Sequence, residues 1–224
     1  MANYAVIFDV DGVLLHLTEQ EEELFFEPFA TRCDAAKLSR DWNSYRIRND
    51  ENIVAEIVER NNLPQVDIEK IKSEYLNLLS TKLAANSLTS QPIEGAAHLL
   101  ANLSNLTLGV ATANFREAAK LRLSQAGLWQ PVSNHAFGAD GGGAKSEILG
   151  RTLNTISVPK SHIIYIGDNV HDVEAGLKHN VHFIAFSEDQ ARLRLLHAAG
   201  AIHLSSNHNQ TFSLIREVLS LAVP

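Results

Sequence analysis

The 224-residue sequence predicts an α/β fold, in which a doubly wound parallel sheet is interrupted by a domain made of helices. A short apolar run, Ala5–Phe8, opens the chain, and residues 16–88 then contain almost no strand-like run. From Pro92 onward, short apolar runs alternate with segments of helical period, a pattern typical of parallel strands joined by right-handed helical crossovers. We therefore expect a Rossmann-like core formed by residues 1–15 and 89–224, and an all-helical domain formed by residues 16–88.

The first predicted strand leads directly into two acidic residues. Four apolar residues are too few for a helix, so Ala5–Phe8 is expected to be a strand buried on both faces. Asp9 and Asp11 follow it on the same side of the chain, and Gly12 allows a sharp turn. Two carboxylates at one strand end repel each other unless they share a proton or a cation, usually Mg²⁺. The alternative is a capping aspartate followed by an ordinary Asp-Gly turn.

The segment of residues 16–88 has helical patterns. The acidic run Glu19–Glu23 suits the positive end of a helix dipole, and apolar residues at helical spacing follow it. Residues 51–61 and 66–83 also repeat apolar side chains every three or four positions. A basic and aromatic stretch in this segment can contact an anionic or sugar substrate, or can form a solvated helix face. It consists of Arg32, Lys37, Arg40, Trp42, Tyr45, Arg46 and Arg48.

The second half of the chain supplies the remaining strands and their crossover helices. We expect strands near residues 106–112, 136–138, 162–167, 182–186 and 201–204, and helices near 95–103, 115–127, 146–156, 170–179 and 189–199. Ligands of such sheets bind beyond the carboxyl ends of the strands. The first strand's acidic pair is therefore expected to meet other polar groups there.

Polar side chains do follow two further predicted strands. Thr112 stands where one strand stops, while Asp168 and Asp172 follow another, and Lys145 precedes a helical segment after three glycines. Each has an ordinary structural alternative, as a helix cap, a first-turn acid or a surface lysine. Their joint occurrence at one sheet edge favours a functional site.

Taken in order, these motifs resemble those of a known superfamily. Asp9-Val-Asp11-Gly-Val-Leu14, Thr112, Lys145 and Gly167-Asp168-x-x-x-Asp172 resemble the four motifs of the haloacid dehalogenase-like (HAD) phosphohydrolases, and the helical segment resembles their C1-type cap domain. Many relatives have Pro-x-Pro after the lysine, where this chain has Ser-Glu, and an acidic or hydroxyl residue where it has Leu15-His16. The phosphoglycolate phosphatase and β-phosphoglucomutase branches both remain open.

The resemblance implies roles for the three aspartates. Asp9 is the implied nucleophile, which forms an aspartyl phosphate, and Asp11 is the implied general acid and base. Mg²⁺ is the implied cofactor, held by a carboxylate oxygen of Asp9, the backbone carbonyl of Asp11 and the side chain of Asp168. True dehalogenases of the superfamily lack the second aspartate, so Asp11 favours phosphate chemistry.

The resemblance also implies supporting and substrate-binding residues. Lys145 neutralises charge beside Asp9, Thr112 donates a hydrogen bond to the phosphoryl oxygens, and Asp172 orients Lys145 or a metal-bound water. His171 lies near the predicted mouth of the site, where a solvent-facing position is the simpler interpretation. The substrate contacts are expected from Thr112, Ala113, Asn114, Arg116 and Lys145.

The expected function is that of a Mg²⁺-dependent phosphatase acting on a small phosphorylated metabolite. A sugar phosphomutase shares every core motif and is the nearest alternative, since only residues of the cap and the lifetime of the intermediate separate the two. A phosphoacceptor signalling module is disfavoured, because the candidate nucleophile lies on the first strand and a long helical segment follows it.

Composition limits the remaining possibilities. The formal net charge of −7 offers no basic surface for nucleic acid. Cys33 is the only cysteine, so an intrachain disulfide is excluded and a reducing compartment is expected. We expect no signal peptide, because the sequence enters a strand directly, and no apolar run is long enough to span a membrane. We expect a cytoplasmic monomer or weak homodimer whose partner is its small substrate.

Overall fold

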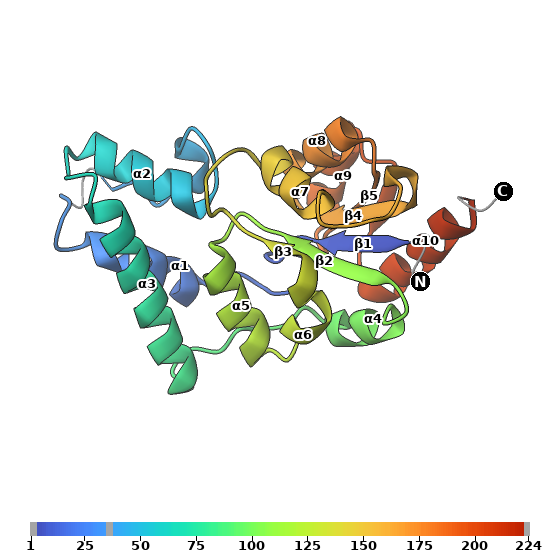
Figure 1. The fold of residues 1–224 in the computed structure, drawn as a ribbon, viewed down its shortest axis with the longest axis horizontal. Helices are drawn as coiled ribbons and strands as arrows, with labels where there is room; N and C mark the ends of the chain where they lie inside the picture. The colour runs from blue at the N-terminus through green and yellow to red at the C-terminus, as the bar shows by residue number, and fades with distance from the viewer. Residues whose placement is uncertain (1–3, 35–37, 222–224) are drawn as a thin grey trace.

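The computed structural model describes residues 4–34 and 38–221, which form a parallel sheet with helices on both faces (Figure 1). The sheet has the strand order β3-β2-β1-β4-β5-β6, and every neighbouring pair is parallel. The predicted doubly wound α/β fold is therefore confirmed. The strands are β1 (Ala5–Phe8), β2 (Thr107–Ala111), β3 (Ala136–Phe137), β4 (Ile163–Gly167), β5 (His182–Phe186) and β6 (His203–Ser205).

The central strand, β1, is buried on both faces. It pairs with β2 on one side and with β4 on the other, so that Phe8 lies opposite Val110 and Ile166. Because successive side chains point to opposite faces, Val6 and Phe8 enter one apolar cluster while Ala5 and Ile7 enter another. This double burial explains why the strand reads as a continuous apolar run.

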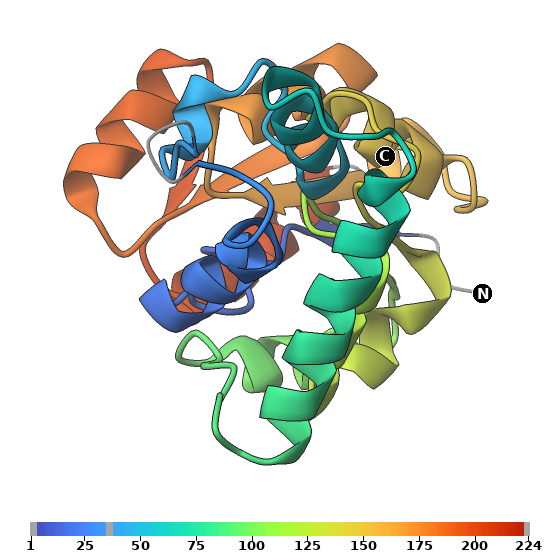
Figure 2. The same cartoon turned by 90° about the vertical axis from the view of Figure 1, so that its left-hand side faces the viewer.

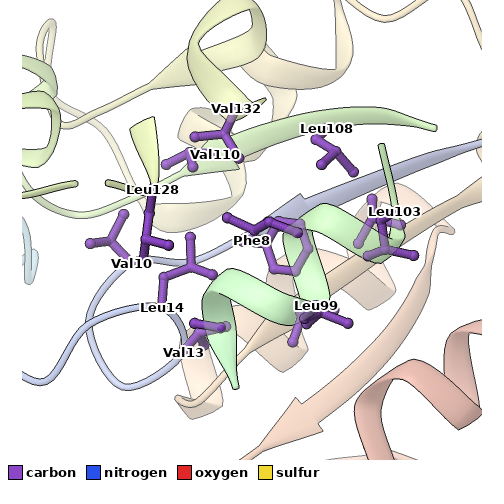
Figure 3. Packing of buried hydrophobic residues seen from close by; sticks show 14 of the residues in the cluster. Phe8, Val10, Val13, Leu14, Leu99, Leu103, Leu108, Val110, Leu128 and Val132 are labelled. Carbon is purple, nitrogen blue, oxygen red and sulfur yellow. The ribbon is translucent and has the colours of Figure 1, made fainter. Parts of the chain in front are cut away.

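The two faces of the sheet are covered by different helices (Figure 1). Figure 3 shows Phe8 packed with Leu99 and Leu103 on one face. That face is covered by α4 (Ala96–Asn102), α5 (Arg116–Gln125), α6 (Trp129–Val132) and α10 (His208–Leu221). The opposite face is covered by α7 (Lys145–Leu153), α8 (Val170–His179) and α9 (Gln190–Ala198). Short 3₁₀ turns, η4 (Ser133–His135) and η5 (Lys160–His162), precede β3 and β4.

The helices between β1 and β2 form a third cluster at the end of the molecule that Figure 2 faces. Those that contribute to it are α1 (Glu19–Phe26), η1 (Glu27–Phe29), η3 (Trp42–Ser44), α2 (Asp50–Arg60) and α3 (Asp67–Ala84), whereas α4, the last helix before β2, packs on the sheet. Thr18 and Glu21 form a capping box that starts α1, and Asn49 caps α2. Phe115, which caps α5, and Ala118 join this cluster, while Ala119 and Leu123 of α5 pack on the sheet, so α5 contacts both parts of the fold. The division at residues 15/16 and 88/89 stays a prediction.

The expected elements agree with the structure to within a few residues. The last strand begins at His203 rather than near Ala201, because residues 199–201 complete the end of α9. The helix α10 was not among the predicted elements, although Ile215 and Val218 repeat at helical spacing. Lys37 of the basic and aromatic stretch lies outside the described residues. In the described part of the chain, no helix combines the length and apolar character that crossing a bilayer requires.

Candidate active site

A pocket of about 580 Å³ opens beyond the carboxyl ends of β1, β2 and β4, with the helical segment on its other side. Most of the sequence-predicted site residues line it: Asp9, Asp11, Thr112, Ala113, Asn114, Lys145, Asp168 and Asp172. The helical segment contributes, among others, Phe25, Trp42, Tyr45, Arg46, Arg48, Asp50 and Tyr75. The pocket thus joins both parts of the chain, as ligand sites at the edge of such sheets do.

Asp9 stands at the end of β1 with its carboxylate almost fully buried. Its Oδ1 accepts a 2.8 Å hydrogen bond from the backbone N–H of Val10, which fixes the orientation of the group. Its Oδ2 lies 2.8 Å from Nζ of Lys145, the first residue of α7. One carboxylate oxygen is therefore held by the backbone and the other faces a cation.

Lys145 bridges two acids. Its Nζ also lies 2.9 Å from Oδ1 of Asp172, which accepts a 2.6 Å hydrogen bond from the hydroxyl of Tyr165. The other oxygen of Asp172 accepts from the backbone N–H of Asn169, in the capping box of α8. Both oxygens of Asp172 are thus engaged, which suits a residue that positions Lys145.

Burial and crowding of carboxylates determine the electrostatics of this cluster. Burial raises the pKa of Asp9 to about 8, with Asp172 and Asp168 adding to the rise and Lys145 opposing it. Burial, and next Asp172, raises the pKa of Asp168 to about 6. Burial would lower the pKa of Lys145, but the carboxylates of Asp172 and Asp9 outweigh it and raise that pKa. Ionising all three carboxylates would therefore place more negative charge here than Lys145 alone compensates.

These carboxylates fit a divalent cation. Oxygen atoms of Asp9, Asp168 and Asp172 lie within 4.8 Å of one another, and hard cations such as Mg²⁺ prefer carboxylate oxygen ligands. Asp9 and Asp168 follow the neighbouring strands β1 and β4 at the pocket and are the side chains best suited to hold the ion, while Asp172 lies one turn into α8 and binds Tyr165, Asn169 and Lys145.

Asp168 is positioned by an arginine that the sequence did not point to. Arg192 of α9 lies 2.9 Å from Oδ2 of Asp168, and its Nε donates a 2.7 Å hydrogen bond to the carbonyl of the same residue. Gly12 leaves room for this carboxylate: a Cβ built there would lie 2.2 Å from Oδ2 of Asp168, and its φ of +74° favours glycine.

Asp11 lies in the same pocket but has different partners. Its Oδ2 accepts a 2.9 Å hydrogen bond from the side chain of Asn114, and its Oδ1 lies 2.7 Å from Nη1 of Arg122. The Arg122 contact is an ion pair without hydrogen-bond geometry. Burial would lower the pKa of Arg122, but Asp11 and Glu21 outweigh it and raise the pKa, so the guanidinium stays charged. The carboxylate of Asp11 is thus separate from the cluster suited to a cation.

The loop after β2 joins the helical segment to the sheet edge. Asp50, the first residue of α2, donates its backbone N–H to the carbonyl of Ala113, and its Oδ2 accepts from the backbone N–H of Phe115 at 2.7 Å. Burial raises the pKa of Asp50 to about 8. Thr112 is buried at the pocket wall, and its Oγ1 accepts from the N–H of Asn114 at 3.2 Å.

Some residues singled out in the sequence lie elsewhere. Arg116 does not line the pocket: its Nε donates to the carbonyl of Ala136 and its guanidinium lies over the ring of Trp129. His171 is exposed at the rim, 3.3 Å from a carboxylate of Glu174. Within the basic and aromatic stretch, Trp42, Tyr45, Arg46 and Arg48 line the pocket, whereas Arg32 pairs with Glu74 and Arg40 lies over Phe26.

Besides Arg192, sequence reasoning missed Arg122, Glu21 and Tyr165. Arg122 follows Ala118 by four residues, and Glu21 precedes Leu24 by three, so both charged residues lie on the buried faces of their helices. This helical spacing was the available indication. The indication is weak, because a charged residue at such a position is normally expected at the border of the buried face, with its charged group in solvent.

Comparisons with known proteins agree with this geometry. Residues 6–186 match the family model described as haloacid dehalogenase-like hydrolase. No curated protein gives a sequence match to the chain.

Solved structures share the fold at low sequence identity. A hydrolase from Pseudomonas syringae is 17% identical, with 96% of this chain and 98% of that chain covered and a TM-score of 0.70. A predicted phosphatase from Clostridium acetobutylicum is 18% identical (97% and 100% covered, TM-score 0.67). A HAD family hydrolase from Deinococcus radiodurans with bound phosphate and sodium is 18% identical (100% and 100% covered, TM-score 0.61). Because the family model matches the chain from β1 through β5, the protein belongs to the haloacid dehalogenase-like hydrolases and is an enzyme.

Proposed function

We propose that this hydrolase is a Mg²⁺-dependent phosphatase that cleaves a small phosphate monoester through an aspartyl phosphate on Asp9. The observation that carries the proposal is the placement of Asp9, whose Oδ2 faces Lys145 inside the pocket, with Asp11 two residues further on. A carboxylate beside a lysine and a second acid are the groups that such a two-step transfer needs.

In the first step, a carboxylate oxygen of Asp9 attacks phosphorus while the bond between phosphorus and the leaving oxygen breaks. Asp11 gives its proton to that oxygen, which leaves as an alcohol. In the second step, a water oxygen attacks phosphorus and the Asp11 carboxylate takes the proton of the water. The bond to Asp9 then breaks, its electron pair returns to the carboxylate, and phosphate is released.

Charge compensation is the main task of the surrounding residues. A carboxylate and a phosphate charge about 4 Å apart repel by roughly 4 kcal/mol at an effective dielectric constant near 20. Lys145 offsets part of this repulsion, and the Thr112 hydroxyl can donate a hydrogen bond to a phosphoryl oxygen. Mg²⁺ held by Asp9, Asp168 and the carbonyl of Asp11 would supply two further positive charges.

The size and walls of the pocket favour a small substrate. A volume of about 580 Å³ is in the range of pockets for metabolites. Helices α1 to α3 would act as a cap that excludes bulk water, with Trp42, Arg46 and Arg48 facing the bound molecule. The relative from Deinococcus radiodurans that holds phosphate and sodium supports a phosphate-binding site on this fold.

Phosphate release tests the proposal directly. Sugar phosphates, phosphoglycolate, nucleotides and p-nitrophenyl phosphate are incubated with the wild type, with Mg²⁺ or with a chelator. Release is expected only with Mg²⁺, and Asp9→Asn is expected to abolish it because the amide cannot act as the nucleophile.

A matched control is Asp189→Asn. The Asp189 side chain caps α9 outside the pocket, and asparagine caps helices equally well, so activity should be retained. Release that persists in Asp9→Asn would refute the mechanism. An aspartyl phosphate that forms on Asp9 but passes to a sugar phosphate instead of water would identify a phosphomutase.

A further inference from the structure

The side chain of Arg122 is buried between the sheet edge and the helical segment. Only 2% of it is exposed, although it carries a charge. Its Nη1 lies 2.7 Å from Oδ1 of Asp11 and donates to the side-chain oxygen of Asn114 at 3.2 Å. On its other side, Nε donates to Glu21 at 2.7 Å, and Nη2 donates to the carbonyl of His16 at 3.1 Å. One guanidinium therefore contacts Asp11 and the start of the helical segment at once.

Arg122 and Asn114 together hold both oxygens of Asp11. Asn114 donates to Oδ2 of Asp11 at 2.9 Å, while Arg122 faces Oδ1 and also binds the oxygen of Asn114. The three side chains thus form a closed triangle. Since Asp11 still has 23% of its side chain exposed, it reaches the pocket from a fixed position.

Glu21 links this triangle to both connections between the helical segment and the sheet. It accepts hydrogen bonds from the N–H and hydroxyl of Thr18, in the first connection. It also accepts from the hydroxyl of Ser90, in the second, at 3.2 Å. Glu21 is itself buried, so its pairing with Arg122 is not replaced by water. Displacement of α1 from the sheet would break this pair.

We propose that Arg122 is a positioning residue for Asp11. Through Glu21, proton transfer by Asp11 also depends on the packing of α1 against the sheet. This inference rests on the proposed phosphatase function and assigns to that site a residue that acts through another. We assign Arg122 no direct role at phosphorus, because it donates hydrogen bonds to Asn114, Glu21 and His16 and pairs its charge with Asp11.

The two chemical steps depend on Asp11 to different degrees when the leaving group is good. The p-nitrophenolate ion leaves without a proton, so formation of the aspartyl phosphate from p-nitrophenyl phosphate needs little help from Asp11. Hydrolysis of that intermediate still needs Asp11 to accept a proton from water. Loss of its positioning should therefore slow the second step and leave the first nearly intact.

The test measures both steps with p-nitrophenyl phosphate and Mg²⁺, by rapid mixing and by quenching to count phosphoenzyme. Arg122→Met is expected to lower kcat by about 10- to 100-fold, with a burst of p-nitrophenolate near one per enzyme and accumulated phosphoenzyme. Arg122→Lys, which keeps the charge but not the fork of donors, should recover part of the rate. If Arg122→Met folds poorly, Glu21→Gln serves in its place. This variant keeps the shape and a hydrogen-bond acceptor but removes the negative charge that pairs with Arg122.

The control is Lys120→Met, which removes a cation from the same helix, where Lys120 pairs with Glu117 outside the pocket. It should leave both steps unchanged. This inference alone would be overturned if the wild type is active and the Arg122 and Glu21 variants either keep the wild-type kcat or slow both chemical steps equally. A wild type that neither releases phosphate nor forms phosphoenzyme would overturn the proposed function, and this inference with it.

Discussion

The hydroxyl of Tyr165 donates a 2.6 Å hydrogen bond to Oδ1 of Asp172, the same oxygen that lies 2.9 Å from the ammonium group of Lys145. Tyr165 is a buried residue of β4, and the contacts from Tyr165 to Asp172 and from Asp172 to Lys145 connect the core of the sheet to Asp9. Burial, and next the charge of Asp172, raises the pKa of Tyr165, so the hydroxyl remains a donor.

Tyr165→Phe removes this donor while keeping the ring. The free energy of unfolding is expected to fall by about 1.5–3 kcal/mol, as for hydrogen bonds to charged groups. Phosphate release should fall by roughly tenfold, because Lys145 loses part of its orientation. Urea unfolding and steady-state assays measure the two effects. Unchanged values in both would show that Asp172 is held adequately by Asn169 and Lys145.

Lys145→Met removes the cation between Asp9 and Asp172. Two buried carboxylates then lose their partner, which should destabilise the fold by about 3–5 kcal/mol and lower kcat by about a hundredfold or more. Thermal unfolding and phosphate release provide the measurements. The matched control is Lys178→Met, because Lys178 donates a hydrogen bond to the hydroxyl of Ser146 near the same helix end and does not line the pocket. Equal losses in the two variants would contradict the role of Lys145.

Gly12→Ala tests the space beside Asp168. The new Cβ would meet Oδ2 of Asp168 at 2.2 Å, so this carboxylate must move. Gly127→Ala is the matched control, because its φ of +72° is similar but no atom lies within 4 Å of the added Cβ. Both variants should lose about 1–2 kcal/mol of stability from the backbone conformation.

The two glycine variants should differ in their need for Mg²⁺. Only Gly12→Ala is expected to require at least about tenfold more Mg²⁺ for half-maximal phosphate release, because Asp168 is displaced. Calorimetric titration with Mg²⁺ checks the binding without reference to turnover. If Gly12→Ala binds Mg²⁺ as the wild type does, Asp168 is not a ligand.

Asp50 should make stability depend on pH. Burial raises its pKa from 3.8 to about 8, so the folded state holds the proton more tightly than the unfolded chain does. The contribution of Asp50 is therefore fully present below about pH 4 and is lost as the pH rises to about 8, by at most about 1.4 kcal/mol per pH unit.

Asp50→Asn removes this titration while keeping an acceptor for the N–H of Phe115. The stability of the wild type relative to the variant should therefore decrease from pH 5 to pH 8, as measured by urea unfolding in a chelator. Asp189→Asn, at an exposed cap of α9, serves as the control. A wild type and Asp50→Asn that respond identically to pH would refute the prediction.

The sheet and much of the candidate site could be predicted from the sequence. The strand β1 reads as apolar because both of its faces are buried, and chain direction alone places Asp9, Thr112 and Asp168 at one edge. The helix α10 was missed because polar residues outnumber apolar ones in its first half, so the period is visible only from Phe212 onward.

Long-range partners of charged residues could not be predicted. Arg122 meets Glu21 across 101 positions of the sequence, and its spacing from Ala118 is too weak a local indication to separate it from an exposed arginine. Arg116 shows the opposite case. Its position after β2 predicted a substrate contact in the pocket, but its side chain contacts the carbonyl of Ala136 and the ring of Trp129. Tertiary packing decides both outcomes.

The pairing of β1 bears on how the enzyme is assembled during synthesis. Ala5 lies opposite Thr107 and Ile163, so the strand that carries Asp9 is made first but finds its neighbours only much later. Closing such long loops makes folding slow, and until β4 emerges from the ribosome β1 offers an unpaired edge. We therefore expect β1 to take its place in the sheet late, and nascent chains that stop before β4 to depend on chaperones to avoid aggregation.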